Sequence, residues 1–267
     1  MRFIHLTDTH LTATGRTLYG IDPAERLRRA VRDINARFND ADFLIVTGDL
    51  AHRGEPEAYR LLQAILGTLT IPVYLGIGNH HRRAPFIRQF PDTATDAQGF
   101  VQYVFTAAGH DFIMLDSVDE GSPSGILSTE RVAWLRDTLA ARRDRGTFLF
   151  LHHAPVPLGI PDLDDIGLRN AAELGDILQQ ADHVKHLFFG HVHRPASGVW
   201  RGIPFSGGIL DNLEPPAYSV VTVSETGDIV VNLHEFMDES PHFYISGAHA
   251  IAEEENPRSV DGTFTRS

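Results

Sequence analysis

Short apolar runs recur along the chain and alternate with segments of a different periodicity. Runs of four to seven residues rich in β-branched and aromatic side chains are typical of strands buried on both faces. Six such runs occupy residues 2–7, 42–48, 72–78, 111–116, 147–153 and 186–191. Apolar residues at i, i+3 and i+4 indicate helices in three segments, residues 23–39, 55–67 and 129–143. The alternation predicts an α/β fold.

The last third of the chain has a different pattern. From about residue 196 the helical spacing stops, and strand-like runs occupy residues 197–200, 218–223 and 228–236. They predict antiparallel strands that form a second sheet within the same domain. We therefore expect one domain over residues 1–235. Residues 236–267 are polar and acidic, and we expect a tail that contacts a partner, forms an oligomer or closes as a lid.

The amino-acid composition limits the size of the core and the cellular compartments that are compatible with the chain. The chain has 267 residues, 42% of them hydrophobic, which is enough for a sizeable core. It contains no cysteine, so disulfides and thiolate metal ligands are excluded, and this fits a reducing cytoplasm. The first ten residues turn polar too early for a signal peptide, and no stretch approaches the roughly 20 apolar residues of a membrane span. We expect a cytoplasmic protein without a membrane partner.

The net charge and the histidine content indicate which kinds of ligand the protein can bind. The formal net charge of −12 disfavours a nucleic-acid polymer, because binding a long phosphate backbone requires many Lys and Arg side chains. A small anion remains compatible with it. The 15 histidines are spread unevenly, with His152, His153, His191 and His193 in two tight groups.

Metal-ligating side chains follow five of the predicted strands. They are Asp8 and His10, Asp49, Asn79 and His80, His152, and His191 with His193. Sites in α/β sheets form beyond the carboxyl ends of the strands, so these segments should meet in one crevice. Because side chains alternate along a strand, the two residues of each Asp-x-His or His-x-His pair should point the same way.

Each of these motifs also has an ordinary structural interpretation. An Asp-x-His after a strand is common as a turn or a helix cap, and so is Thr-Gly-Asp. Charged and imidazole groups are costly in a strand-end crevice unless they are paired or metal-bound, and five coincidences would be needed together. Imidazole, carboxylate and amide ligands without thiolate suit Mn, Fe, Zn or Co, and a central carboxylate can bridge two ions. We therefore expect two divalent metal ions and hydrolysis of phosphate esters.

The ordered motifs resemble a known family. Asp8-x-His10, Gly48-Asp49, Gly78-Asn79-His80, His152 and Gly190-His191-x-His193 resemble the calcineurin-like metallophosphoesterases from residue 1 to about 195. The stretches GRTLYGIDP, RGEPEAYRLLQAILGTL and LHHAPVPLGI resemble more narrowly the bacterial class III cyclic-nucleotide phosphodiesterases and their glycerophosphodiesterase relatives. The resemblance implies a two-sheet β-sandwich flanked by helices, in four layers αββα. It also implies hydrolysis of small phosphodiesters by a hydroxide held between two metals.

The resemblance also implies a role for each site residue. One metal would be bound by Asp8, His10, Asp49 and His193, and the other by Asp49, Asn79, His152 and His191, with Asp49 as the bridge and a catalytic residue. His80 would be the second catalytic residue, beside the scissile phosphate. Of the adjacent pair, His152 is favoured as the ligand, and His153 would orient a ligand or pack as an ordinary histidine.

Two positions depart from the family pattern. Relatives usually have Asp or Glu where this chain has His81, and many have Asp where it has His52. Loss of a nearby carboxylate should lower the basicity of His80, since a negative neighbour favours imidazolium. In the same loop, Arg82 or Arg83 could reach a phosphate oxygen or could simply be solvated.

Three functions compete at this point. A phosphodiesterase acting on 3′,5′-cyclic nucleotides or glycerophosphodiesters is favoured. A metal-dependent phosphomonoesterase is the nearest alternative, and a non-catalytic scaffold of the same fold is opposed by the intact set of ligands. We expect a small phosphodiester as the partner molecule and a homo-oligomeric protein. The sequence does not identify which metals are bound or which phosphodiester is the substrate.

Overall fold

The computed structural model describes residues 1–208 and 216–236. The predicted domain over residues 1–235 falls within these ranges apart from 209–215, whereas the predicted tail, from residue 237 onward, lies outside the described residues. Helices occupy α1 (Pro23–Arg37), α2 (Pro56–Leu66), α3 (Arg83–Gln89), α4 (Thr129–Ala140), α5 (Pro161–Asp164) and α6 (Ala171–Leu178). None of these helices is long and apolar enough to cross a membrane.

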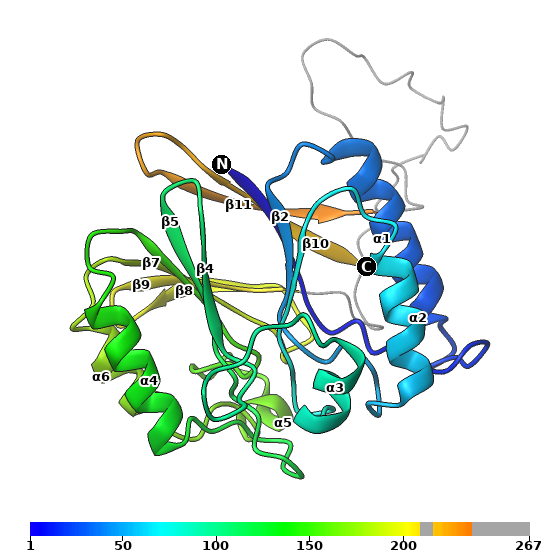
Figure 1. The fold of residues 1–267 in the computed structure, drawn as a ribbon, viewed down its shortest axis with the longest axis horizontal. Helices are drawn as coiled ribbons and strands as arrows, with labels where there is room; N and C mark the ends of the chain where they lie inside the picture. The colour runs from blue at the N-terminus through cyan, green and yellow to red at the C-terminus, as the bar shows by residue number, and fades with distance from the viewer. Residues whose placement is uncertain (209–215, 237–267) are drawn as a thin grey trace, which may run out of the picture. The chain divides into compact units, whose positions relative to one another are not determined.

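The strands form two mixed sheets (Figure 1). The first sheet has the order β11 (Ile229–Glu235), β10 (Ala217–Val223), β1 (Arg2–Leu6), β2 (Phe43–Val46), β3 (Val73–Leu75). The second has the order β4 (Tyr103–Ala107), β5 (His110–Met114), β6 (Thr147–Phe150), β7 (Val184–Phe189), β9 (Ile203–Gly207), β8 (Ala196–Trp200). Within them β1, β2 and β3 run parallel to one another, as do β5, β6, β7 and β9.

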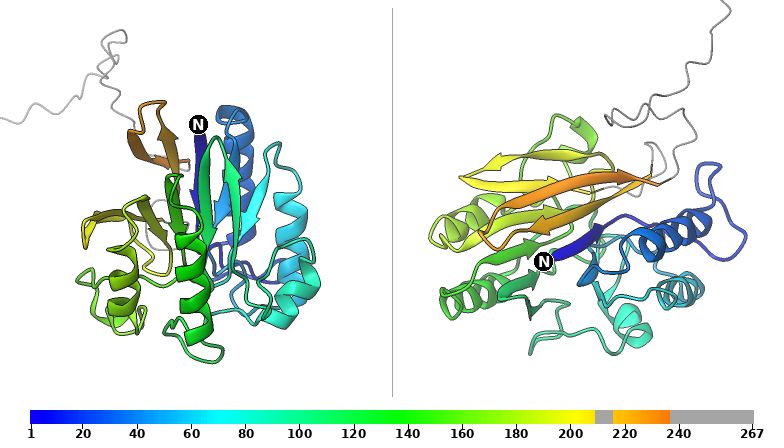
Figure 2. Two further views of the ribbon diagram at one scale, coloured as in Figure 1. Left: turned by 60° about the vertical axis from the view of Figure 1, so that its left-hand side comes forward. Right: turned by 90° about the horizontal axis from the view of Figure 1, so that it is seen from above.

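The prediction that the C-terminal strands form a sheet of their own is wrong. β8 and β9 extend the second sheet beyond β7, and β10 and β11 extend the first sheet beyond β1 (Figure 2). Without these additions, the buried strands β1 and β7 would be sheet edges with unpaired backbone groups, which is unfavourable. The added strands therefore complete both sheets.

The expected four-layer arrangement is confirmed. Leu27, Val31 and Ile34 of α1 and Leu62 of α2 pack on the first sheet, and Leu135 of α4 and Leu174 of α6 belong to the separate cluster on the outer face of the second sheet. Between the sheets lies an aromatic cluster. Phe3 of β1 contacts Phe43, Phe112, Phe148, Phe150 and Phe188 at ring-centroid distances of 5.2, 5.5, 5.9, 6.0 and 5.7 Å.

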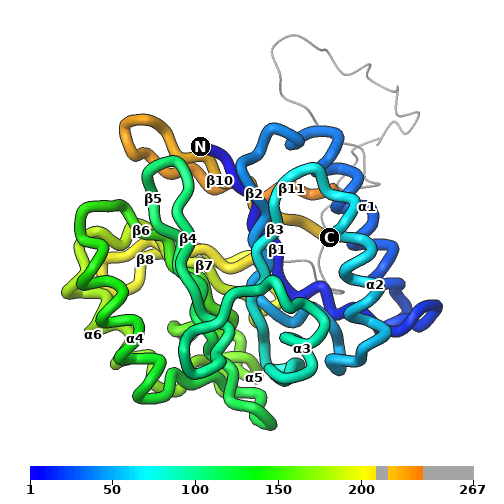
Figure 3. The backbone as a smooth tube through the Cα atoms, viewed as in Figure 1, coloured from blue at the N-terminus to red at the C-terminus, as the bar shows by residue number. Residues whose placement is uncertain are grey.

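Local sequence signals account for the helix that follows β1. Asp22 accepts hydrogen bonds from the backbone N–H groups of Ala24 and Glu25, and Pro23 occupies the first helical position. The parallel register then brings β2 and β3 beside β1, so that the loops after all three strands emerge at one edge (Figure 3). That edge holds most of the predicted ligands.

Candidate metal centre

The five predicted motifs meet at the carboxyl ends of the parallel strands. Residues after β1, β2 and β3 come from the first sheet, and residues after β6 and β7 come from the second. Among the described residues, four groups of side chains have ligand atoms that lie within 4.8 Å of one another inside each group. These groups are Asp8, His10 and His193; Asp8, Asp49 and His152; His152, His153 and His191; and His10, His52 and His80.

The backbone around the ligands is not strand-like, contrary to the expectation from side-chain alternation. β1 ends at Leu6 and β7 at Phe189, before either pair of ligands begins. Five ligand candidates instead have left-handed φ angles: Asp8 57°, His10 41°, Asp49 43°, His191 72° and His193 52°. Non-glycine residues rarely adopt this conformation, and such strain concentrates at functional sites. Tight turns, rather than strand pleating, aim these side chains at one point.

Asp8 is fixed from two directions. The Thr7 hydroxyl donates to its Oδ2 at 2.7 Å, and the backbone N–H of His191 donates to Oδ2 at 3.0 Å. The Nε2 atoms of His10 and His193 each lie 3.8 Å from Oδ1. Burial alone would raise the pKa of Asp8, but the imidazoles of His10 and His193 hold it below its ordinary value. Asp8 is therefore a carboxylate between two imidazoles.

Asp49 lies at the centre of the site. Its Oδ1 accepts the backbone N–H of His80 at 3.1 Å, and its Oδ2 is 3.2 Å from His152 Nε2. His10 and His80 each place Nε2 at 3.8 Å from the same Oδ2. Burial raises the pKa of this carboxyl group, but His152 and His10 outweigh that effect and leave the pKa well below its usual range.

Asn79, His152 and His191 form the other side of the centre. The Nε2 atom of His152 lies 3.1 Å from Asn79 Oδ1, while its Nδ1 donates to the carbonyl of Thr47 at 3.1 Å. Burial lowers the pKa of His152, but Asp49 raises it above its ordinary value. Burial lowers the pKa of His191 to about 4, so this imidazole is neutral and can act as a ligand.

The donor set fits divalent cations. Both ring nitrogens of His10 and the Nε2 of His191 are buried without a hydrogen-bond partner in the described part of the chain. Buried imidazole nitrogens without partners are costly unless something binds them. Carboxylate oxygens, an amide oxygen and neutral imidazoles are a suitable set for Mn, Fe, Zn or Co.

His80 is partly exposed to solvent, whereas the carboxylate beside it is buried. Its side chain is 31% accessible, whereas that of Asp49 is 1% accessible. The Nδ1 atom donates to the backbone carbonyl of His52 at 2.5 Å, so the Nε2 atom is the one that faces Asp49 and the open site. The backbone of His52, not its side chain, therefore orients His80. The His52 ring lies 5.2 Å from the His80 ring and 5.7 Å from that of His10.

His81 points away from the ligand cluster. It is 1% exposed, and its two ring nitrogens face the backbone N–H groups of Ala51, at 3.1 Å, and Gly78, at 3.2 Å. Burial lowers its pKa to about 3, so the ring is neutral and has only one acceptor nitrogen for two donors.

His153 lies closer to the centre than expected. Its ring is 4.8 Å from that of His191 and 5.0 Å from that of His152. The Nδ1 atom hydrogen-bonds to the Ser117 hydroxyl at 2.8 Å, and the buried Nε2 atom has no partner among the described residues. Strand alternation would turn His153 away from His152, but β6 already ends at Phe150, before both residues.

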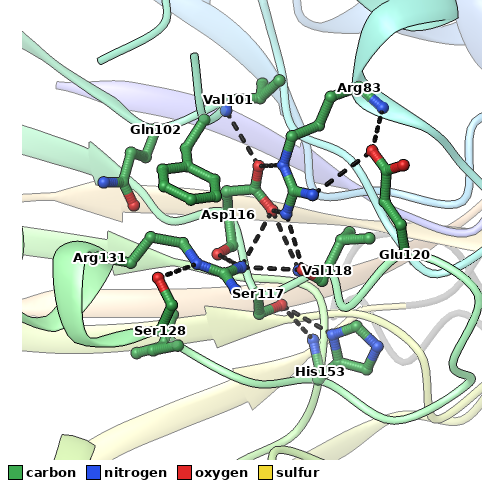
Figure 4. Close-up of polar contacts among 12 residues, drawn as sticks. Arg83, Val101, Gln102, Asp116, Ser117, Val118, Glu120, Ser128, Arg131 and His153 are labelled. Atoms are coloured by element: carbon green, nitrogen blue, oxygen red, sulfur yellow. Dashed lines mark hydrogen bonds and ion pairs between the residues drawn. The ribbon is translucent and has the colours of Figure 1, made fainter. Parts of the chain in front are cut away.

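The two arginines of the loop have different surroundings. Arg83 binds Asp116 with Nε at 2.6 Å and Nη2 at 2.7 Å, so it belongs to a buried network with Arg131 (Figure 4). Arg82 is exposed and lines a pocket beside His80. Only Arg82 is placed where it could meet a substrate.

Three glycines of the site directly precede a ligand, and the sequence motifs included them without giving them a role. A Cβ atom at Gly48 would lie 2.6 Å from His152 Nδ1, and one at Gly190 would lie 2.8 Å from Asp8 Oδ2. At Gly78 it would overlap Asp49 Oδ1 and lie 2.7 Å from His152 Nε2. The repeated pattern of glycine before ligand was a signal for this close approach of backbone and side chains.

The fold and the donor set define an α/β protein with a multi-histidine metal centre where two packed sheets meet. The chain belongs to the calcineurin-like phosphoesterase family, whose model matches residues 1–195. The resemblance inferred from the motifs is thereby confirmed.

The chain is also similar to individual proteins with related names and folds. The chain is 41% identical over 270 residues to a protein of Rhodopseudomonas palustris named "Probable cyclic nucleotide phosphodiesterase", covering 94% of this chain and 98% of the relative. It is 31% identical to the glycerophosphodiester phosphodiesterase of Enterobacter lignolyticus, covering 72% and 71%. The solved structure of a dimetal phosphatase from Danio rerio superposes with a TM-score of 0.71 at 15% identity, covering 87% and 95%, which supports the fold.

Proposed function

We propose that this protein is a dinuclear-metal phosphodiesterase that hydrolyses small phosphodiesters. The position of Asp49, between one donor group on the His10 side and another on the His152 side, is the observation that carries the proposal. The names of two relatives, one a cyclic nucleotide and one a glycerophosphodiester phosphodiesterase, support the substrate class.

The proposal assigns each ligand to an ion. Asp8, His10, Asp49 and His193 would hold one ion, and Asp49, Asn79, His152 and His191 would hold the other. When bound, such ions supply Lewis-acid chemistry, which activates water and neutralises charge on the phosphoryl oxygens. Asp8 and Asp49 are carboxylates with lowered pKa values, which suits this role. His153 is a candidate to orient His191 or to assist in binding the second ion.

His80 is proposed as the residue that serves the leaving group. The hydrogen bond from its Nδ1 to the His52 carbonyl leaves Nε2 as the atom that would carry and deliver a proton. A loop that exposes His80 while burying Asp49 lets substrate reach this nitrogen. The His52 side chain and His81 would not contact the substrate phosphate.

Two alternatives lead to different measurable activities. A phosphomonoesterase of the same fold would favour monoesters, and a scaffold would show no turnover. A monoester carries close to two charges and a diester carries one. The ligand set gains positive charge only from its ions, so the extra charge of a monoester would gain less there than in a phosphatase with an arginine clamp. Cyclic nucleotides and glycerophosphodiesters are both represented among the relatives, so both are included in the test.

A turnover panel with manganese-loaded protein tests the proposal. The substrates are aryl monoesters and diesters, 3′,5′- and 2′,3′-cyclic nucleotides, and glycerophosphodiesters. We expect a higher kcat/KM for an aryl diester than for the matching monoester, and the reverse order would favour the phosphatase alternative. Asp49→Ala should abolish turnover and lower the metal content from about two ions per chain toward one or none. Normal turnover with two tightly bound ions in that variant would refute the bridging role.

The homo-oligomeric state, the cytoplasmic location and the separate role of the tail stay predictions from the sequence. They do not affect the chemistry proposed for the centre.

A further inference from the structure

A pocket of about 160 Å³ adjoins the metal centre at His80. Its walls include Asn79, His80 and, on the side away from the ligands, Arg53, Arg82 and Gly121. Of the seven candidate metal ligands, only Asn79 lines it. Since a water molecule occupies about 30 Å³ in the liquid, the volume suits one oxyanion with part of its linker.

Two arginines supply positive charge at this pocket. Arg53 and Arg82 are exposed, and neither has an ion pair with an acidic side chain among the described residues. Two acidic side chains of the neighbouring segments hydrogen-bond to other groups. Glu55 accepts the backbone N–H of Arg53 at 3.1 Å, and Glu120 binds Arg83. In a chain with a formal charge of −12, two such guanidinium groups in one pocket are an anion site.

Hydrogen bonds and close packing hold the segments that carry the pocket walls. Arg83, which follows Arg82, binds Asp116 through two guanidinium nitrogens (Figure 4). The backbone N–H of Arg83 donates to the Glu120 carboxylate, and Glu120 directly precedes the wall residue Gly121. On the opposite wall Gly54 has a φ of 63°, and a Cβ there would lie 3.2 Å from the His80 carbonyl. Both arginines therefore extend from backbone whose position is fixed relative to His80.

We propose that Arg53 and Arg82 bind a second anionic group of the substrate, so that the preferred substrate is a phosphodiester that also carries a phosphate monoester or a carboxylate. This inference rests on the proposed phosphodiesterase function. A diester with one charge would place that charge at the ligand cluster and leave both guanidinium groups unused. Guanidinium groups pair bidentately with both phosphate and carboxylate. Phosphate is the stronger of the two ligands when its charge is close to two, because a carboxylate carries only one charge.

The test compares matched substrates that differ in one anionic group. The first pair is the dinucleotide ApA and its 5′-phosphorylated form pApA, and the second is glycerophosphoethanolamine and glycerophosphoserine. With manganese-loaded protein we expect kcat/KM to be about tenfold higher for pApA than for ApA, mainly through KM. Product chromatography identifies the bond that is broken. The second pair shows whether a carboxylate is accepted in place of the phosphate.

Variants connect the preference to the pocket. Arg53→Ala and Arg82→Ala should each reduce the pApA to ApA ratio toward one, and the Lys variants should retain part of it. Arg60→Ala makes the same charge change on the exposed face of α2, outside the pocket, and should keep the wild-type ratio. Thermal unfolding of each variant confirms that the fold is retained.

The outcomes are distinguishable. Cleavage of ApA and pApA with equal kcat/KM, or a ratio that falls equally in Arg60→Ala, would overturn the anion site and leave the phosphodiesterase function in place. No cleavage of any diester, together with cleavage of aryl monoesters, would overturn the proposed function and this inference with it.

Discussion

His186 should make the folded protein sensitive to mild acid. Its ring lies in β7 against Phe188, at a centroid distance of 4.4 Å, and its Nε2 is 2.9 Å from the Ser206 hydroxyl in β9. Burial lowers its pKa from 6.5 to about 4. The perturbation that tests this is His186→Gln, which retains a hydrogen-bonding nitrogen near Ser206 and removes the titrating group.

The sign and size of the effect follow from proton linkage. Between pH 6.5 and pH 4 the unfolded chain binds a proton at this position and the folded protein does not, so the free energy of unfolding falls as the pH falls. The loss is 1.36 kcal/mol per pH unit, which amounts to about 2 kcal/mol at pH 5. A domain with a total stability of about 5–15 kcal/mol loses a substantial share of it. Below pH 4 both states are protonated and the loss is complete.

Urea unfolding at several pH values between 8 and 5, in the presence of a chelator, measures this effect without a contribution from bound metal. The wild type should lose about 2 kcal/mol more than His186→Gln between pH 7 and pH 5. His5, whose pKa burial lowers to about 3, adds to the wild-type slope, so the difference between the two proteins is the quantity of interest.

A matched control separates the hydrogen bond from the titration. Ser206→Ala removes the hydroxyl partner but keeps the buried imidazole, so its stability should be lower by a similar amount at every pH while the slope is unchanged. If His186→Gln has the wild-type slope, the imidazole is not held neutral by burial, and the reasoning is refuted.

Three further predictions concern the centre. Gly78→Ala should lose bound metal, measured by elemental analysis, with its circular dichroism spectrum retained, because the added methyl group would overlap the Asp49 carboxylate; a full metal content would contradict this. His80→Ala should keep both metals but slow the reaction by about 10²–10⁴-fold, most for poor leaving groups, so metal loss would show that it is a ligand. His81→Asp should keep both metals and activity, because the side chain at this position faces backbone N–H groups of Ala51 and Gly78 rather than the ligands; metal loss would show that His81 supports the centre.

The sequence was most informative about the buried strands and about where ligands gather. The apolar runs that become β1, β2, β6 and β7 are buried on both faces, so their composition alone marks them. The run at 72–78 was too long as a strand, because Gly76 to Gly78 leave β3 to form the ligand loop. β4 was missed because it lies at the sheet edge and only Tyr103 of its five residues is buried.

The local geometry of the ligands could not be predicted from the sequence pattern. Strand alternation assigned Asp8 and His10 to one face, whereas left-handed turns aim them, and only tertiary packing stabilises such turns. The orientation of His80 depends on the carbonyl of His52, and a backbone group leaves no trace in residue identity. Arg83 looked like its neighbour Arg82 in the sequence, but the buried Asp116 that binds it comes from a distant loop.

The centre depends on the packing of the two sheets as much as on its ligands. Asp8 and Asp49 extend from the first sheet and His152 and His191 from the second, so how closely the carboxylates approach these imidazoles depends on the spacing between the sheet ends. The aromatic cluster around Phe3 determines that spacing, because its ring contacts four phenylalanines of the second sheet. Interiors packed this densely have few alternative arrangements, so the left-handed turns can be kept in place without metal. The stability of the core is therefore what allows strained, polar loops to meet at one point, and binding of divalent ions would then stabilise a geometry that the sheets already impose.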